Sequence, residues 1–247
     1  MNRYFYDLHI HSCLSPCGDD DMTPANIAGM GVINGLNIMA LTDHNTCGNC
    51  PAFFKACRQH GIIPVAGMEL TTAEDIHLVC LFEDLDTAMS FDAEVKGHIM
   101  DIKNRPDIFG HQYYMDEADN ILGEEEKLLI SATDYNVETA IALVHGYGGV
   151  CYPAHIDRTS NGMIATLGDI PLEYGFTTVE FNDKENAESY REKYAAVKDA
   201  RILCSSDAHY LWDINEAKHS LEIDDEPYSS ALVRKNLLFN IINIKIK

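Results

Sequence analysis

Histidines and carboxylates in this sequence gather where short apolar runs end. Five runs close on such residues, within Asp7-Leu8-His9-Ile10-His11, Thr42-Asp43-His44, Gly67-Met68-Glu69, Pro153-Ala154-His155 and Ser206-Asp207-Ala208-His209. His77 opens a further run. Side chains two apart in a strand point the same way, so His9 and His11 can present their imidazoles to one ion. Asp207 and His209 have the same spacing.

These residue types suit a divalent metal centre. Imidazole nitrogens together with carboxylate oxygens are typical ligands of Zn, Mn and Fe. A single His at a strand end is more often structural, and a single Asp there often caps the next helix. Five such strand ends are hard to explain in that way. Two ions about 3.5–4 Å apart, bridged by a carboxylate, would activate a water and clamp a phosphate.

The elements that must position these residues follow a βα rhythm. Apolar runs predict strands at 4–10, 36–41, 62–68, 76–82, 149–154, 177–181 and 201–205, the third and fourth close enough for a hairpin. Helices are predicted at 24–34, 49–60, 86–103, 137–145, 184–200 and 229–239, before a β-branched tail at 241–246. Alternating strands and helices indicate parallel βα units, whose strand C-termini are where α/β enzymes place their sites.

One segment interrupts this rhythm. We interpret the chain, 1–247, as a single domain in which 83–129 is an insertion or small subdomain that could act as a lid. Within it, 106–122 is polar, tyrosine-rich and predicted to be irregular. Tyr113 and Tyr114 could stack a base or a sugar, although such residues more often pack the insertion's own small core.

The amino-acid composition limits the kinds of partner that the chain is expected to bind. The net charge is −21 at pH 7, which repels a phosphate backbone at long range and argues against a duplex-DNA partner. Bound cations can reverse that sign locally, so a small phosphorylated substrate stays compatible. No run approaches the ~20 apolar residues of a membrane helix, and the first seven residues lack a basic-then-apolar leader. We therefore expect a cytoplasmic protein without a membrane partner, and make no prediction of its oligomeric state.

The ordered set of stretches resembles a known family, the PHP (polymerase and histidinol phosphatase) domain. It comprises Asp7-Leu8-His9-Ile10-His11-Ser12, Leu41-Thr42-Asp43-His44, Gly67-Met68-Glu69, His77, Pro153-Ala154-His155 and Ser206-Asp207-Ala208-His209. Any one stretch is a weak signal, whereas the ordered set is highly specific. The resemblance implies a distorted (β/α)7 barrel of the α/β class, with two or three divalent ions (Zn, Mn or Fe) at the strand C-termini.

The resemblance also implies a division of ligands. By position, the first ion would take His9, His11, Glu69 and Asp207. Glu69 would bridge to a second ion, completed by His77 and His155. His44 and His209 would hold a third, and Asp43 would orient a neighbouring ligand.

One loop departs from the family pattern. Where the family has an Asp that helps to hold the third ion, this chain reads Ser15-Pro16-Cys17-Gly18-Asp19-Asp20-Asp21, with proline at the aligned position. Asp19 is the favoured substitute, followed by Asp20 or Cys17. A site with only two ions is an open alternative.

Four cysteines lie in the loops after the first two strands. Cys13, Cys17, Cys47 and Cys50 have a Cys-x3-Cys and a Cys-x2-Cys spacing that could form a structural zinc site. Such spacing arises easily by chance, so four unlinked thiols are the preferred interpretation.

The predicted reaction is hydrolysis of a phosphomonoester or phosphodiester of a small molecule, nucleotide or short oligonucleotide by a metal-activated water. Asp207 or His209 would manage protons, and Arg158, three residues after His155, could hold the phosphate unless it forms only a surface salt bridge. Two alternatives stay open. They are an amidohydrolase-like C–N hydrolase and a non-catalytic metal-binding regulatory domain.

Overall fold

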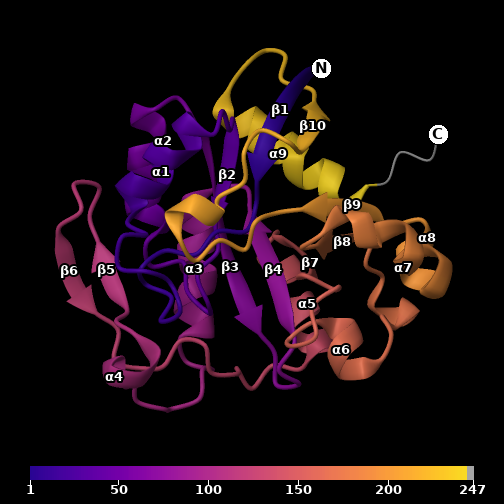
Figure 1. The fold of residues 1–247 in the computed structure, drawn as a ribbon, viewed down its shortest axis with the longest axis horizontal. Coiled ribbons are helices and arrows are strands. Elements are labelled where there is room, and N and C mark those ends of the chain that lie inside the picture. Colours follow the sequence, from indigo (N-terminus) through magenta and orange to yellow (C-terminus); the bar gives the residue numbers. More distant parts are fainter. Residues whose placement is uncertain (244–247) are drawn as a thin grey trace.

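A curved six-stranded sheet organises the molecule, whose computed structural model describes residues 1–243 (Figure 1). The strand order is β10-β1-β2-β3-β4-β7. Their bounds are Ser220–Ile223 for β10, Asn2–Asp7 for β1, Ile38–Leu41 for β2, Ile63–Thr71 for β3, His77–Phe82 for β4 and Val150–Pro153 for β7. The four residues of β2 and the nine of β3 are all buried, as expected for strands covered on both faces.

A second sheet completes a barrel. It pairs β8 (Thr178–Phe181) in parallel with β9 (Arg201–Cys204). Ile156, just after β7, donates its N–H to the carbonyl of Glu180 in β8 at 2.9 Å. Beyond β9, the N–H of Asp207 donates to the carbonyl of His9 at 2.9 Å, next to a parallel bridge between Ile10 and Ala208. Apart from the edge strand β10, seven strands thus surround one interior, which confirms the distorted (β/α)7 barrel.

The strand directions differ from an all-parallel barrel. β1, β2 and β3 run parallel, but β4 is antiparallel to both β3 and β7. The predicted hairpin between the third and fourth strands is therefore confirmed. In its register Thr71 pairs with His77, so the first residue of β4 lies at the C-terminal end of β3. The reversal brings His77 to the end of the barrel where the other strands finish.

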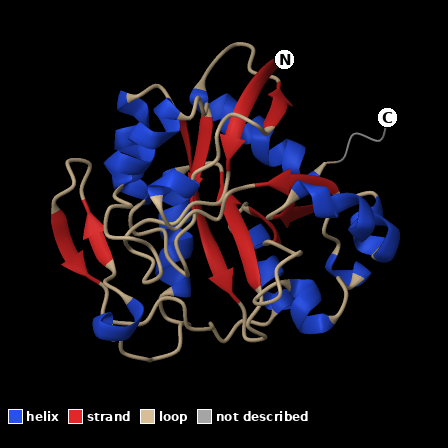
Figure 2. Ribbon diagram, viewed as in Figure 1, coloured by secondary structure: helices blue, strands red, loops and turns tan. Residues whose placement is uncertain are grey.

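Helices cover the strands on the outside (Figure 2). They are α1 (Pro24–Ile33), α2 (Cys50–Gln59), α3 (Leu85–Val95), α4 (Pro106–Phe109), α5 (Val137–Gly146), α6 (Met163–Leu167), α7 (Ala187–Lys193), α8 (Ala195–Lys198) and α9 (Ser230–Ile242). Short 3₁₀ turns occur at η1 (Leu172–Tyr174), η2 (Lys184–Asn186) and η3 (Leu211–Asp213). The helix α1 starts at a Thr23 cap followed by Pro24, and the Thr23 hydroxyl accepts the N–H of Asn26. Among the described residues, no helix has the length and apolarity needed to cross a membrane.

Several predicted elements were wrong in extent. The helix predicted at 86–103 ends at Val95, two residues before Gly97, because glycine disfavours helix. The helix predicted at 184–200 breaks at Tyr194, whose backbone is extended. The segment 106–122, predicted to be irregular, contains α4 and the strand β5 (Tyr113–Met115), which pairs with β6 (Ile121–Glu124). The predicted tail 241–246 begins within α9, and 244–247 lie outside the described residues.

The insertion 83–129 contains α3, α4 and the β5–β6 hairpin, which lies at the left edge of Figure 1, away from the central sheet. It is tied to the loops after β1 and β2. Tyr113 donates its N–H to the carbonyl of Cys13 at 2.9 Å, and Met115 donates its N–H to Asn49 Oδ1 at 2.9 Å. The insertion therefore packs against the sides of two loops that carry candidate ligands.

Candidate metal centre

Glu69 is the centre of a buried cluster at the C-terminal end of the barrel strands. Its Oε1 lies 2.8 Å from His77 Nδ1, 3.0 Å from His155 Nε2 and 3.3 Å from His9 Nε2. Its Oε2 lies 3.0 Å from His44 Nδ1 and 3.2 Å from His11 Nε2. One carboxylate thus contacts five imidazoles that come from four separate stretches of the chain, because His9 and His11 share one stretch.

Asp207 adds a second carboxylate from the loop after β9. Its Oδ1 lies 3.1 Å from His11 Nε2 and 3.3 Å from His9 Nε2. His209, two residues further on, stacks on His11 with ring centroids 4.3 Å apart. All eight ligand positions expected for the barrel strands therefore lie in one cluster.

Potential ligand atoms within 4.8 Å of one another form three overlapping groups among the described residues. They are His9, His11, Glu69 and Asp207; His44, Glu69 and His77; and His11, His44 and His209. The first group is the set expected for the first ion. The second differs from expectation because it contains His44 in place of His155, although His155 also contacts Glu69. How the remaining histidines divide between a second and a third ion stays a prediction.

The tautomer of His9 follows from a residue that the sequence reasoning missed. Glu180 in β8 lies with Oε1 2.8 Å from His9 Nδ1, and both side chains are buried. A carboxylate at this position accepts the Nδ1 proton, which leaves a lone pair on Nε2. The same Glu180 oxygen accepts the backbone N–H of His155 at 3.2 Å. The only signal in the sequence was an acid between two apolar strand residues, Val179 and Phe181.

A chain of hydrogen bonds fixes His11 in the same way. The hydroxyl of Ser15 donates its proton to Asp43 Oδ1 at 2.7 Å and lies 2.9 Å from His11 Nδ1. Because that proton is already committed, His11 must donate from Nδ1 to the serine oxygen. Asp43 also accepts the N–H and the hydroxyl of Ser12, at 2.6 and 2.7 Å. Asp43 therefore orients a neighbouring ligand through Ser15.

These assignments test whether a cation fits the site. With both Nδ1 atoms donating, the Nε2 atoms of His9 and His11 carry lone pairs and yet lie 3.1 Å apart, beside Glu69 and Asp207. His209 Nδ1 lies 2.8 Å from the backbone carbonyl of Asp207, so its Nε2 lone pair is also free. Electron pairs that face each other in a dry interior need a positive charge between them. The donor set fits divalent metal ions, and in their absence protons must substitute.

The pKa values of the clustered histidines agree with a site that binds cations. Burial by itself would lower the pKa of His11, but Asp207 and Glu69 outweigh it and raise the pKa to about 9. Burial would also lower the pKa of His9, but the carboxylates of Glu180, Glu69 and Asp207 raise it well above its ordinary value. Burial lowers the pKa of His44 to about 3 and that of His209 to about 4. Without ions, protons therefore concentrate on His9 and His11.

Two candidate ligands have backbone conformations that most residues avoid. The φ angle is 30° at His155 and 51° at Asp207, in the left-handed region that usually favours glycine. Such strain costs on the order of 1–3 kcal/mol and clusters at functional sites. Here it turns the chain sharply just after β7 and β9, which directs both side chains toward Glu69.

Asp7 supports the loop that carries Asp207. Its two carboxylate oxygens accept the N–H groups of Ser206 and Asn215, each at 3.0 Å. Burial raises the pKa of Asp7 to about 6. Although it lies in the first stretch with His9 and His11, Asp7 belongs to none of the three ligand groups.

Arg158 lies at the mouth of the cluster. Its Nη1 is 2.5 Å from Asp207 Oδ2, and its Nη2 donates to Asn182 Oδ1 at 3.3 Å. It borders two adjoining cavities, of about 180 Å³ beside Glu69, His77 and His155, and of about 560 Å³ beside Asp207 and His209. Its side chain is 40 % exposed, so the guanidinium can meet a ligand at the mouth while it stays paired with the cluster.

The loop that departs from the family pattern contributes differently from expectation. Asp19 joins none of the three ligand groups, and its Oδ1 accepts the N–H of Asp21 at 3.0 Å. Asp20 is exposed. Cys17 borders the larger cavity beside Asp207 and His209. Burial, and then the charges of Glu69 and Asp207, raise the pKa of its thiol.

The other cysteines of these loops act as small buried residues. Cys13, Cys47 and Cys50 are buried, and no disulfide joins them. The Cys47 thiol lies 3.1 Å from the carbonyl of Gly67. None of the four belongs to a metal-ligand group in the described part of the chain.

One curated relative matches part of the sequence. A 5′-3′ exoribonuclease of Haemophilus influenzae is 33 % identical over 79 residues, which are 31 % of this chain and 28 % of that relative. The match thus covers little more than a quarter of the relative's length.

Solved structures match almost the whole chain at low identity. The lesion-specific endonuclease PfuEndoQ from Pyrococcus furiosus has a TM-score of 0.66 at 16 % identity, over 99 % of this chain and 57 % of that one. A complex of endonuclease Q with a 27-mer duplex has a TM-score of 0.62 at 17 % identity, over 95 % and 56 %. A protein from Bifidobacterium adolescentis described as a metal-dependent phosphoesterase has a TM-score of 0.58 at 19 % identity, over 94 % and 95 %. At these identities the likeness concerns the fold.

The family comparison covers most of the chain. The PHP domain matches residues 7–202, which hold six of the eight clustered ligand residues; Asp207 and His209 follow that range. Together with the barrel and the Glu69-centred cluster, this match shows that the chain belongs to the PHP domain family.

Proposed function

We propose that this chain is a metal-dependent phosphoesterase that hydrolyses a phosphomonoester or phosphodiester of a small molecule, nucleotide or short oligonucleotide. A metal-dependent hydrolase follows from the family. The observation that carries the proposal is the convergence of His9, His11, Glu69 and Asp207, with imidazole lone pairs facing one another beside an arginine. Positively charged groups at the mouth of the cluster would attract a phosphate oxyanion.

The proposed ligand sets are those that the resemblance to the family implies, and the first of them is also a group of neighbouring ligand atoms in the cluster. His9, His11, Glu69 and Asp207 would hold one ion. Glu69, His77 and His155 would hold a second, and His44 and His209 a third, with zinc, manganese or iron as candidates. When bound, such ions lower the pKa of a coordinated water and attract phosphate oxygens.

Three residues of this chain would handle the substrate. Arg158 would turn part of its guanidinium from Asp207 to the phosphate, which it can hold through two N–H groups. Asp207 would accept a proton from the nucleophilic water. His209, neutral at pH 7, is the alternative proton acceptor.

The substrate class is supported by charge and by the relatives. A net charge of −21 favours a small or short substrate over a long polyanion. The exoribonuclease match supports a nucleotide or an RNA end. The endonuclease Q complex contains a duplex, but this chain spans only 56 % of that protein, so contacts to a duplex can come from the part that this chain does not match.

The insertion 83–129 is proposed to support the site rather than to cover it. The two cavities beside the cluster are bordered by residues outside this segment. Its contacts instead reach Cys13 and Asn49. Asn49 in turn donates to the hydroxyl of Ser12, which donates to Asp43. The insertion would thereby hold the hydrogen bonds that orient His11.

A substrate screen tests the proposal. The purified chain, loaded separately with zinc, manganese and iron, is assayed on phosphomonoesters, phosphodiesters and short RNA, with amides in parallel. We expect hydrolysis of a phosphoester and a loss of at least about a hundredfold in Asp207→Asn, while the surface control Glu188→Gln keeps its activity. Hydrolysis of amides alone, or full activity of Asp207→Asn, would refute the proposal.

A further inference from the structure

An exposed tyrosine, Tyr210, borders the mouth of the metal centre, and an exposed tryptophan, Trp212, stacks on it. Tyr210 follows His209 directly, and Trp212 lies in the adjacent 3₁₀ turn η3. Their rings stack, with centroids 4.9 Å apart and planes inclined by 16°. Tyr210 is 41 % exposed and Trp212, the only tryptophan of the chain, is 75 % exposed.

This exposure needs an explanation. Tryptophan is usually largely buried, since exposing its large apolar surface to water is unfavourable. Leu211, between the two, is half-buried and packs against the core. The extended backbone at Tyr210 thus directs one residue inward and leaves its two neighbours together on the outside.

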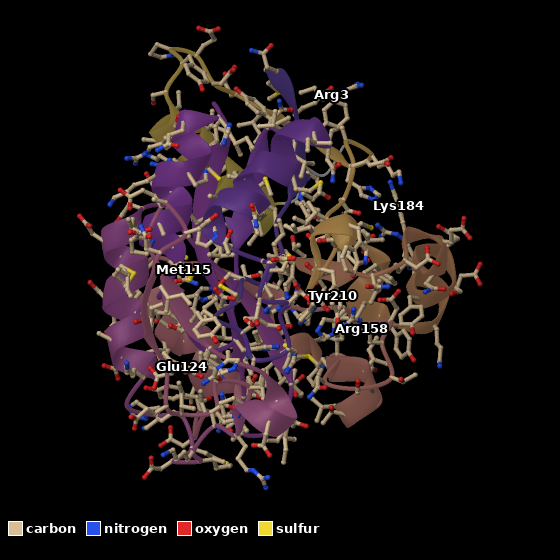
Figure 3. All side chains as sticks on the ribbon, turned by 60° about the vertical axis from the view of Figure 1, so that its left-hand side comes forward. Arg3, Met115, Glu124, Arg158, Lys184 and Tyr210 are labelled. Atoms are coloured by element: carbon tan, nitrogen blue, oxygen red, sulfur yellow. The ribbon has the colours of Figure 1, made fainter. Side chains whose placement is uncertain are left out.

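The pair adjoins the cavity that would receive the phosphate. Tyr210 borders the cavity of about 560 Å³ together with Arg158, Asp207 and His209. Figure 3 shows Tyr210 and Arg158 near each other, with Met115 and Glu124 of the insertion well apart from them. Asn182 and Asn215, two neutral amides, border the same cavity. A volume of a few hundred Å³ suits a ligand larger than a phosphate ion.

We propose that Tyr210 and Trp212 form a stacking platform for the nucleobase of the substrate, next to the phosphate held by the cluster and Arg158. The inference rests on the proposed function and specifies its substrate as a nucleotide or the end of an oligonucleotide. A base is neutral, so the acidic surface does not repel it, and every base offers a ring face to stack. The amides of Asn182 and Asn215 are polar groups in reach of a base edge or a sugar, and Ser205, Ser206 and Asp213 border the same cavity.

The single tryptophan makes the test direct. Its fluorescence is followed while the full chain, with zinc, is titrated with adenosine 5′-monophosphate or with ribose 5-phosphate, which has the same phosphate and sugar but no base. We expect saturable quenching by the nucleotide alone. By calorimetry, Trp212→Ala should weaken nucleotide binding about tenfold relative to ribose 5-phosphate, and Trp212→Phe should restore most of it.

The control is Tyr228→Ala, another exposed tyrosine, which lies near Tyr4 at the opposite end of β1. It should bind the nucleotide like the unmodified chain. The proposal would be overturned if the unmodified chain bound both ligands with equal affinity. It would also be overturned if the tryptophan emission changed with protein concentration and not with nucleotide, because Trp212 would then contact a second copy of the chain. A chain that binds the base but hydrolyses no phosphoester would keep the platform and refute the proposed activity.

Discussion

At the residue scale, the hydrogen-bond acceptors behind the ligands decide what the cluster can bind. Glu180 and Ser15 fix the protons of His9 and His11 on Nδ1, so that both Nε2 lone pairs face inward. Spacing two residues apart predicted the ligands themselves. It could not predict Glu180, because a hydrogen-bond partner has no required spacing from the histidine that it orients.

Replacing Glu180 should weaken metal binding without removing a ligand. In Glu180→Gln, the amide can present its N–H₂ to His9 Nδ1, which favours the other tautomer and puts a proton on Nε2. Loss of such a partner typically lowers metal affinity about 10–100-fold. Competition with a chelating dye measures the affinity. The control Glu185→Gln, on an exposed turn, should bind like the unmodified chain, and equal affinities for both variants would show that Glu180 does not orient His9.

Replacing Arg158 should weaken the hold on a phosphate. A charge-assisted hydrogen bond contributes about 1.5–3 kcal/mol, so Arg158→Ala should raise KM for a phosphoester at least about tenfold. Steady-state kinetics measure this, with Arg105→Ala, whose arginine pairs with Asp107 on the surface, as the matched control. If KM stayed unchanged, Arg158 would form only a salt bridge with Asp207.

At the element scale, the strands bring the ligands together. Most of these strands could be predicted from apolar runs in the sequence. The antiparallel direction of β4 could be predicted because only a short segment separates it from β3. The strand β10 was missed because its four residues, Ser220–Ile223, carry too little pattern, and it is stabilised by pairing with β1. The β5–β6 hairpin was missed since its strands have only three and four residues, the segment 116–120 between them is mostly polar, and β6 is exposed.

The contact between the insertion and the first loop offers a test. Gly110 has a φ of 92°, and a Cβ added there would lie 2.4 Å from the carbonyl oxygen of Pro16. Gly110→Ala should therefore push the insertion off this loop and destabilise the chain by about 1–3 kcal/mol, as seen by thermal unfolding, with a loss of metal affinity. Gly123→Ala, whose added Cβ meets no atom within 4 Å, is the matched control. If Gly110→Ala were destabilised but kept its full metal affinity, the contact between the insertion and this loop would have no influence on the metal site.

At the scale of the whole molecule, a chain of net charge −21 gathers six of its eleven histidines in one cluster. The fold class and the shared position of the ligands could be predicted from the order of the stretches, because parallel strands end on one side of a barrel. The place of Asp19 could not, since a loop's course depends on contacts such as its N–H bond to the carbonyl of His209.

The pH dependence of metal stabilisation follows from His9 and His11. Their pKa values are raised in the folded, metal-free chain, His11 from 6.5 to about 9. Their protonation stabilises that state fully below pH 6.5, and the contribution is lost as the pH rises through about 9. Ions must displace these protons, so metal affinity should increase over the same range. The rise in Tm on adding zinc, measured from pH 6.5 to 9, should therefore grow with pH.

The exposed His98 provides the control, because His98→Asn should keep this pH dependence whereas His11→Asn should reduce it. A rise in Tm that is the same at every pH would mean that the ions do not compete with protons on His9 and His11.

Anomalous diffraction from crystals of the zinc-loaded chain tests the central claim most directly. The account predicts at least one strong anomalous peak within about 2.0–2.3 Å of His9 Nε2, His11 Nε2, Glu69 and Asp207. An anomalous map without a peak at these four residues, in crystals that contain zinc elsewhere, would contradict it.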